Sequence, residues 1–310
     1  MTRRSAQTQE HEELRPLLLS IAYRMVGSAT EAEDVVQEAY LRFHRSVTAG
    51  EVIESPKSYL SAIVTRLAID HLRSARVRRE QYVGPWLPEP LLTSEAPDPA
   101  EHAETADSLS MAFLVLLESL SPVERAVFLL REVFGFAYDE VAGVVHKTED
   151  NCRQIATRAR HHIDARRPRF EPSRKQREEL AERFFAAAMN GDMGGLMELL
   201  AADVVMVGDG GGKAPAIRQP LHGSDRVARF FAAGARELRR IDLKVRPTEI
   251  NGQPGALMFD KDGRLINVFS LDIADGRVQT IRAILNPDKL RHLGRVGDVG
   301  QLVREARARD

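Results

Sequence analysis

The sequence has few of the features that would place the protein in a membrane, outside the cell or around a metal ion. Cys152 is the only cysteine, so no internal disulfide and no cysteine-based metal site can form. No apolar run approaches the ~18 residues of a membrane span. Residues 1–16 also lack the apolar stretch of a secretory signal. These absences predict a cytoplasmic protein, and we expect no metal, no cofactor and no membrane contact.

An excess of charge of one sign is also missing, because 44 basic and 45 acidic residues give a net charge of −1. This balance argues against a simple nucleic-acid coat protein. Residues 57–80 and 153–169 are nevertheless rich in arginine, whereas residues 95–107 between them are acidic. Two basic segments separated by an acidic one predict two contacts with one polyanion. The alternative is two solvated helix faces.

Apolar residues recur at helical spacing through residues 11–80. Gly27 and Ser28 interrupt the first helix, and a second helix is predicted to begin near Thr30 as its N-cap. Pro56 opens a third helix, because proline is favoured at the first helical position. The next segment, residues 84–100, holds five prolines and is predicted to be a linker.

A second helical segment runs from Leu109 to just before Pro168, and the chain then changes character. Helices followed by β-branched and alternating runs predict an α+β domain. The expected helices are 178–190 and about 224–239, and the expected strands are 203–207, 241–250, 255–259, 264–274 and 277–285.

The sharpest local pattern is that of a helix-turn-helix. Residues 138–145 form a short first helix, His146 and Lys147 make the turn, and Thr148 caps a second helix. Such a helix fits the major groove, where Arg can pair with guanine and Gln with adenine. An ordinary helical hairpin is the alternative. The outward side chains that we expect to read DNA are Arg153, Gln154, Arg158 and Arg160.

Three segments in this order resemble the sigma factors of the extracytoplasmic-function group. EAEDVVQEAYLRFHR (31–45) resembles the core-polymerase-binding helix of sigma region 2, and residues 57–80 resemble the helix that opens and reads the −10 promoter element. Residues 116–163 resemble sigma region 4, which reads the −35 element. Two residues depart from the usual pattern, since Arg66 stands where asparagine is common and His146 where glycine is common.

The resemblance assigns roles to residues at the matching positions. Asp34, Gln37 and Glu38 share one helix face and are expected to bind core polymerase. The loop 46–56 is expected to hold a flipped base, with Tyr59 more typical of the core. The residues expected at the −10 element are Lys57, Arg66, Arg73, Arg76 and Arg78.

The linker motif WLPEP (86–90) and the later motifs DGGGK (209–213) and NPDKL (286–290) resemble the signatures of one subfamily. Its members carry a polyketide-cyclase-like (SnoaL-like) domain behind region 4, with the cone fold of nuclear-transport-factor-like proteins. The resemblance implies regulation in cis, with no separate anti-sigma protein required. The predicted regulatory residues are Trp86, Leu87, Pro88, Asp209, Gly210, Gly211, Gly212, Lys213, Asn286, Pro287 and Asp288.

We therefore predict a non-enzymatic RNA polymerase sigma factor whose partners are core RNA polymerase and promoter DNA. Two alternatives stay open, a stand-alone helix-turn-helix regulator and a ligand-binding or cyclase-like enzyme with a DNA-targeting half. For an enzyme, or for an unidentified small ligand, the candidate groups are Asp203, Asp209, His222 and Asp272, which form no recognisable dyad. The predicted domains are 1–83 (region 2), 84–108 (linker), 109–168 (region 4), 173–290 (SnoaL-like) and 291–310 (tail).

Overall fold

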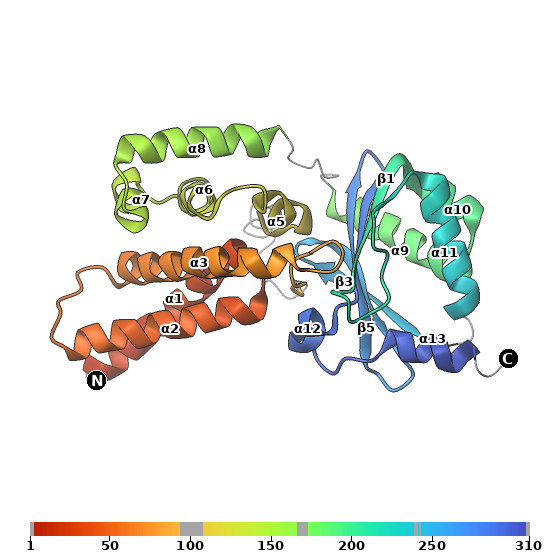
Figure 1. Ribbon diagram of the computed structural model, residues 1–310, viewed down its shortest axis with the longest axis horizontal. Helices are drawn as coiled ribbons and strands as arrows, with labels where there is room; N and C mark the ends of the chain where they lie inside the picture. Colours follow the sequence, from red (N-terminus) through yellow and green to blue (C-terminus); the bar gives the residue numbers. More distant parts are fainter. Residues whose placement is uncertain (1–2, 94–107, 166–172, 239–240, 242, 308–310) are drawn as a thin grey trace. The chain divides into compact units, whose positions relative to one another are not determined.

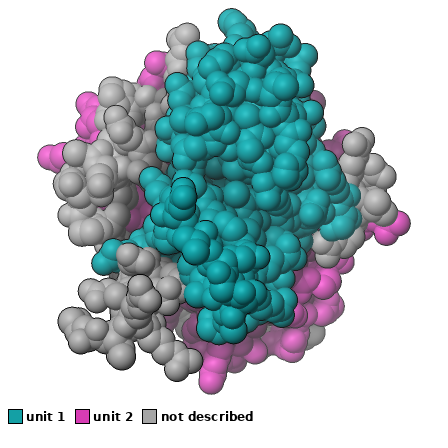
Figure 2. Space-filling view, turned by 90° about the vertical axis from the view of Figure 1, so that its left-hand side faces the viewer, with its two compact units in different colours: residues 1–80, 114–167 teal, residues 81–113, 168–310 magenta. Residues whose placement is uncertain are grey.

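The computed structural model describes residues 3–93, 108–165, 173–238, 241 and 243–307. The chain folds into two compact units, which Figure 1 and Figure 2 show. Unit 1 comprises residues 1–80 and 114–167, and unit 2 comprises residues 81–113 and 168–310. Residues 84–93, the described first part of the predicted linker, therefore belong to the same unit as the C-terminal part of the chain.

The first half of unit 1 is a bundle of α1 (Arg3–Val26), α2 (Ala29–Thr48) and α3 (Pro56–Glu80). The predicted break is found, but Thr30 as the N-cap of α2 is wrong. The Oγ of Ser28 accepts the Glu31 N–H at 3.1 Å, so Ser28 is the cap. Gly27 ends α1 with a φ of 73°, which leaves Ser28 extended and Thr30 already inside the helix.

The second half of unit 1 contains α6 (Pro122–Phe128), the π-helical turn η1 (Leu129–Val133), α7 (Tyr138–Val145) and α8 (Glu149–Asp164). The predicted helix-turn-helix is present in α7 and α8. Thr148 caps α8 by accepting the Asn151 N–H, and His146 adopts the left-handed conformation with a φ of 53°. Histidine tolerates this conformation better than most non-glycine residues. A short helix, α5 (Met111–Leu117), precedes this half.

Unit 2 is an α+β domain built on a six-stranded sheet with the strand order β2-β1-β6-β5-β4-β3. Among the pairings between the described strands of this sheet, only that of β1 with β6 is parallel. The strands are β1 (Leu200–Asp209), β2 (Leu221–His222), β3 (Lys244–Ile250), β4 (Gln253–Phe259), β5 (Leu265–Ala274) and β6 (Arg277–Ile284). The helices α9 (Arg174–Asn190), α10 (Met193–Leu199) and α11 (Ser224–Leu238) lie together on one face of this sheet (Figure 1).

Four short helical elements of unit 2 were not predicted from the sequence. The Gly-Gly pair in α10 resembles a turn, but burial of Leu196 and Leu199 in the core supports the helix. The segment 291–310, predicted as a tail, contains η2 (Arg291–Leu293) and α13 (Val299–Arg307), and Leu302 packs into the core. The remaining short helix, α12 (Pro287–Leu290), lies within the NPDKL motif.

Candidate functional site

The acidic face predicted on α2 is solvent-accessible. Asp34 and Gln37 are exposed, and Glu38 is partly exposed with an ion pair to Arg42 at 2.8 Å. Leu41 lies four residues after Gln37 on the same face and is 47% exposed. Sequence reasoning missed this residue, although the exposed leucine gives the acidic face an apolar contact point.

The cations predicted on α3 have different surroundings. Arg73 is exposed and lies 3.4 Å from Asp70, whereas Lys57 stands over the Phe136 ring at 5.6 Å. Arg66 donates to two main-chain carbonyls at the end of α7, those of Gly143 at 2.7 Å and Val144 at 3.0 Å. The guanidinium of Arg66 thus links α3 to α7 inside unit 1. The side chains of Arg76 and Arg78 lie outside the described residues.

The loop between α2 and α3 exposes Val52, whose side chain is 92% accessible. Tyr59, at the start of α3, is half-buried. Its ring meets the edge of Phe43 and its hydroxyl hydrogen-bonds with that of Ser46 at 2.9 Å. This packing fits the core role expected for Tyr59 and leaves Val52 as the prominent apolar side chain of the loop.

The four polar residues predicted on the outer face of α8 fall into two pairs. Arg153 bonds to Glu149 at 2.8 Å, and Arg160 is held by both carboxylate oxygens of Glu132. The side chains of Gln154 and Arg158 are exposed and form no hydrogen bond or ion pair with any described residue. One pair is therefore fixed by the protein and the other is available to a partner.

In unit 2, the residues of the three predicted motifs meet around one buried carboxylate. Asp209, at the end of β1, is fully buried and accepts the Leu87 N–H at 2.8 Å. The ammonium of Lys289 lies 2.7 Å from the same carboxylate and also donates to the Leu87 carbonyl. The Tyr82 hydroxyl donates to the other carboxylate oxygen. Its burial, together with the hydrogen bond to Asp209 and the charge of Asp209, raises the pKa of Tyr82.

The contacts around Asp209 attach the linker to the domain, and we call them the first docking station. Aromatic and amide groups nearby complete it. The ammonium of Lys289 stands 4.2 Å from the centre of the Trp86 ring and 4.9 Å from that of Tyr82, within cation–π range. Asn286 caps α12 and donates to the Tyr82 hydroxyl at 2.8 Å. The flanking charges of Lys213 and Asp288 pair at the surface. Pro88 is buried and Pro287 opens α12.

The glycines of DGGGK allow the backbone to approach the linker closely. Gly211 has a φ of 57°, and a Cβ there would meet the Asn286 amide at 2.2 Å and the Tyr82 hydroxyl at 2.9 Å. A Cβ on Gly212 would lie 3.2 Å from Val83, and one on Gly210 would lie 2.2 Å from a carbonyl of the same loop. These contacts require glycine.

A second docking station lies at the turn between β3 and β4. Leu91 and Asn251 exchange two hydrogen bonds of 2.9 Å, and Leu92 forms a β-bridge with Ile250. Thr93 donates to the Glu249 carboxylate at 2.6 Å and accepts the Gly252 N–H at 2.9 Å. The linker is therefore attached to unit 2 from Tyr82 to Thr93, and no motif in the sequence pointed to this turn.

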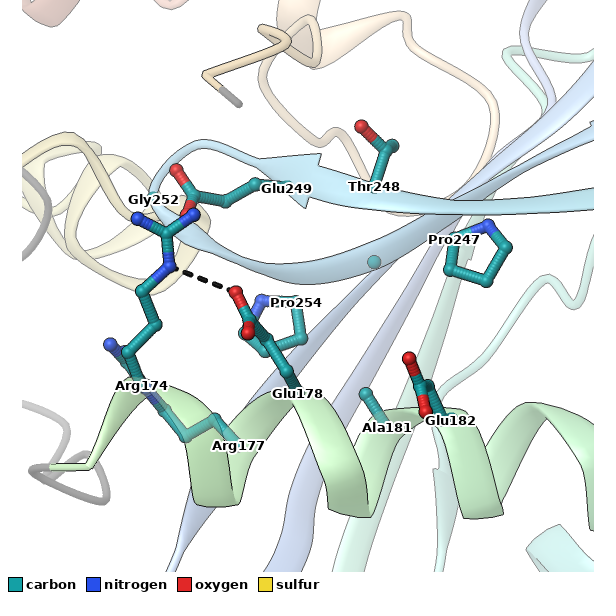
Figure 3. Close-up of a pocket in the computed structure, with 11 residues that line it drawn as sticks. Arg174, Arg177, Glu178, Ala181, Glu182, Pro247, Thr248, Glu249, Gly252 and Pro254 are labelled. Carbon is teal, nitrogen blue, oxygen red and sulfur yellow. Dashed lines mark hydrogen bonds and ion pairs between the residues drawn. The ribbon is translucent and has the colours of Figure 1, made fainter. Parts of the chain in front are cut away.

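A pocket of about 230 Å³ lies beside this second station, between α9 and the β3–β4 hairpin (Figure 3). Arg174 ion-pairs with Glu178 at 2.8 Å and with Glu249 at 3.2 Å. Arg177 donates to Gln253 at 2.8 Å. Glu249 thus contacts both the pocket and the linker.

The acids and the histidine considered for catalysis do not converge. Asp203 and His222 are exposed, Asp209 pairs with Lys289, and Asp272 forms a buried ion pair of 2.7 Å with Arg282. The space between the helices and the sheet is filled by packed rings, with centroid separations of 5.3–6.2 Å among Phe184, Phe185, Phe231 and Phe269.

Comparison with known proteins decides the family. Sigma-70 region 2 matches residues 11–78, sigma-70 region 4 matches residues 110–163, and the SnoaL-like domain matches residues 181–285. The ECF RNA polymerase sigma factor SigJ of Mycobacterium tuberculosis is 36% identical over 301 residues, which cover 91% of this chain and 93% of SigJ. The chain belongs to the ECF RNA polymerase sigma factors.

Further matches support the same family and the fold of this sigma factor. The probable ECF RNA polymerase sigma factor SigI of Mycobacterium tuberculosis is 32% identical over 278 residues, covering 89% of this chain and 92% of SigI. The crystal structure of Mycobacterium tuberculosis SigJ matches with a TM-score of 0.72 and 33% identity, over 92% of this chain and 98% of that one.

The predicted family and fold class are thus confirmed: helical sigma regions 2 and 4 precede a SnoaL-like α+β domain. Within the described part of this sigma factor, no helix is both long and apolar enough to cross a membrane. In unit 2, the functional candidates that sequence reasoning missed are Tyr82, Lys289 and the β3–β4 turn. The motif NPDKL contained Lys289, but a lone lysine is ordinarily a surface residue.

Proposed function

We propose that this sigma factor is regulated in cis by its SnoaL-like domain, which acts as a dock for the linker and not as an enzyme. The observation that carries the proposal is the buried Asp209, whose oxygens are shared among Leu87, Lys289 and Tyr82. A buried ion pair is stable only when its remaining hydrogen-bonding capacity is satisfied. Here the linker backbone supplies part of that capacity, so docking and charge compensation support each other.

Catalysis fits the domain less well than docking does. Rings fill the region between the helices and the sheet, and the two buried acids considered, Asp209 and Asp272, are each neutralised by a basic residue. A general acid or base must instead reach a substrate. The pocket beside the second docking station borders Glu249, so an occupant there would act on linker attachment by competing for that carboxylate.

The sigma regions are proposed to bind core polymerase through α2 and promoter DNA through α3 and α8. The accessible face with Asp34, Gln37, Glu38 and Leu41 supports the first contact. Reversing charge with Asp34→Lys and Glu38→Lys should abolish co-purification with core polymerase without unfolding the protein. Glu51→Lys, on an exposed loop, is the matched control. Normal co-purification of the double variant would overturn this assignment.

Run-off transcription with core polymerase tests regulation in cis. Asp209→Asn should release the linker and change promoter output, whereas Asp203→Asn, an exposed carboxylate on the same strand, should not. Trp86 is the only tryptophan and reports linker release by fluorescence in the same samples. Unchanged transcription by a variant whose Trp86 signal shows release would refute the proposal.

A further inference from the structure

The helix-turn-helix contains a stack of three side chains that the sequence did not reveal. The Tyr138 ring, at the first position of α7, lies 4.6 Å from the guanidinium carbon of Arg131 and 4.9 Å from that of Arg153. Arg131 comes from the π-helical turn and Arg153 from α8. We name this group the Arg-Tyr-Arg stack.

The π-helical turn explains why these residues meet. The Phe134 N–H bonds to the Leu129 carbonyl and the Phe136 N–H to the Leu130 carbonyl, so the backbone widens at the end of α6. Leu129 and Leu130 are buried, while Arg131 turns toward α7 and donates to the Phe136 carbonyl at 2.9 Å. Turns of this kind occur often at functional sites.

The same turn also fixes a second arginine of α8. Glu132, the next residue, binds Arg160 through both carboxylate oxygens, with an Nε–Oε2 distance of 3.0 Å. Arg153 and Arg160 are seven residues apart and therefore lie near one flank of α8. The scaffold holds the arginines on this flank, whereas Gln154 and Arg158 extend from the helix without a hydrogen bond or ion pair to any described residue.

The stack concentrates positive charge at one place. Two guanidiniums share one ring, and two carboxylates offset part of this charge, Glu149 at 2.8 Å and Asp150 at 3.8 Å from Arg153. Arg153 remains about half exposed. In a docked helix-turn-helix the first helix crosses the DNA backbone while the second enters the groove. The start of α7, where Tyr138 contacts Arg153 of α8, is thus where a backbone phosphate is expected.

We propose that the Arg-Tyr-Arg stack is a binding site for one phosphodiester of the −35 DNA. Tyr138 is a positioning residue that holds Arg131 and Arg153 in place before DNA arrives, and base reading falls to Gln154 and Arg158. Phosphate contacts fix register without carrying sequence information, whereas base-edge contacts specify. The inference rests on the promoter-binding role proposed for α8.

Holoenzyme binding to a promoter fragment at several salt concentrations tests the site. Tyr138→Leu should weaken binding about tenfold for every −35 sequence alike. It should also reduce the slope of log affinity against log salt by about 0.9, the value for one lost phosphate contact. Tyr138→Phe keeps the ring and should behave as wild type. Arg131→Gln, which leaves Tyr138 in place, should reproduce the loss if Tyr138→Leu fails to fold.

Gln154→Ala provides the contrasting variant, because it should change preference at one −35 position and leave the salt slope unchanged. A changed base preference with an unchanged slope in Tyr138→Leu would overturn the proposal, since Arg153 would then be reading a base. Loss of affinity in Tyr138→Phe would also overturn it, because the ring would not be the active part. If α8 itself did not bind the promoter, Gln154→Ala and Arg158→Ala would have no effect on any sequence, a distinguishable result.

Discussion

Substituting Asp209 by asparagine removes a single charge from the centre of the first docking station. The side chain keeps its size and can still accept the Leu87 N–H, but Lys289, now 2.7 Å from a neutral group, remains buried. Removing one partner of a buried ion pair costs about 3–5 kcal/mol. We therefore expect the ratio of docked to released linker to fall by roughly two to three and a half orders of magnitude.

Trp86 fluorescence measures this change at the linker itself, because the chain has one tryptophan. The docked ring faces the Lys289 ammonium at 4.2 Å, so release should shift its emission to the red and expose it to a soluble quencher. The double variant Asp209→Asn with Lys289→Met removes both charges, keeps an acceptor for the Leu87 N–H and should recover much of the docking. The exposed Asp203→Asn is the matched control.

Two results together would refute this reasoning. Trp86 fluorescence would be unchanged in Asp209→Asn, and the free energy of unfolding would fall by less than about 1 kcal/mol. The hydrogen bonds of the linker would then suffice, and the buried charge would have no role in docking. Equal release in Asp209→Asn and in the double variant would also contradict the argument, since the double variant leaves no uncompensated charge.

Three further predictions concern single groups. Arg66→Ala should destabilise unit 1 by about 1.5–3 kcal/mol in chemical denaturation, because a charged donor to two carbonyls is lost. Arg73→Ala, which removes only an exposed ion pair, should cost under about 1 kcal/mol. Equal losses in the two variants would contradict the α3–α7 link. Burial and the adjacent carboxylate raise the pKa of Tyr82, so the docked state keeps the proton of the Tyr82 hydroxyl. The docked state is therefore fully stable below pH ~10 and loses stability as the pH rises further. A spectrophotometric titration should show one tyrosine that ionises at higher pH than the others, and Tyr82→Phe should remove this phase. Gly211→Ala should release Trp86, whereas Gly263→Ala, which also has positive φ but open space around it, should not; release in both would place the cause in backbone strain elsewhere.

The helix-turn-helix could be read from the sequence because its signals are local. The Thr148 cap lies three residues before the amide it accepts, and the buried face of α8 follows the helical period through Cys152 and Ile155. The Ser28 cap was missed by two residues because Ser28 and Thr30 are both good capping residues. Only the φ of Gly27 decides between them.

The docking station could be anticipated only as a set of motifs. Asp209 and Lys289 are 80 positions apart and meet because the parallel strands β1 and β6 end together and α12 follows β6. Nothing local distinguishes Lys289 from a surface lysine. The π-helical turn is similarly hidden, since Leu129–Val133 continues an ordinary helical pattern. Long-range pairing and small changes of helix register are therefore the features that local sequence patterns could not predict.

The connection between the two DNA-reading modules gives docking a mechanical consequence. Residues 82–93 lie in the chain between α3 and α6, and both docking stations hold them. A released segment of this length can extend to about 40 Å. One base pair adds about 3.4 Å to DNA, close to the reach of one extended residue. We infer that docking shortens the free connection between regions 2 and 4 and so limits how far they can follow a longer or shorter promoter spacer.

We therefore expect linker release to broaden the range of spacer lengths that the holoenzyme accepts. Run-off transcription from promoters with spacers altered by one and two base pairs should show a sharp optimum for the wild type and a flatter profile for Asp209→Asn. Asp203→Asn should keep the sharp optimum, since its exposed carboxylate touches neither station. An added base pair also rotates the −35 element by roughly a tenth of a turn about the DNA axis. The released linker must therefore let region 4 rotate as well as move along the DNA. If the profile of Asp209→Asn kept its shape and changed only in height, docking would set the amount of active sigma factor and not the geometry of promoter recognition.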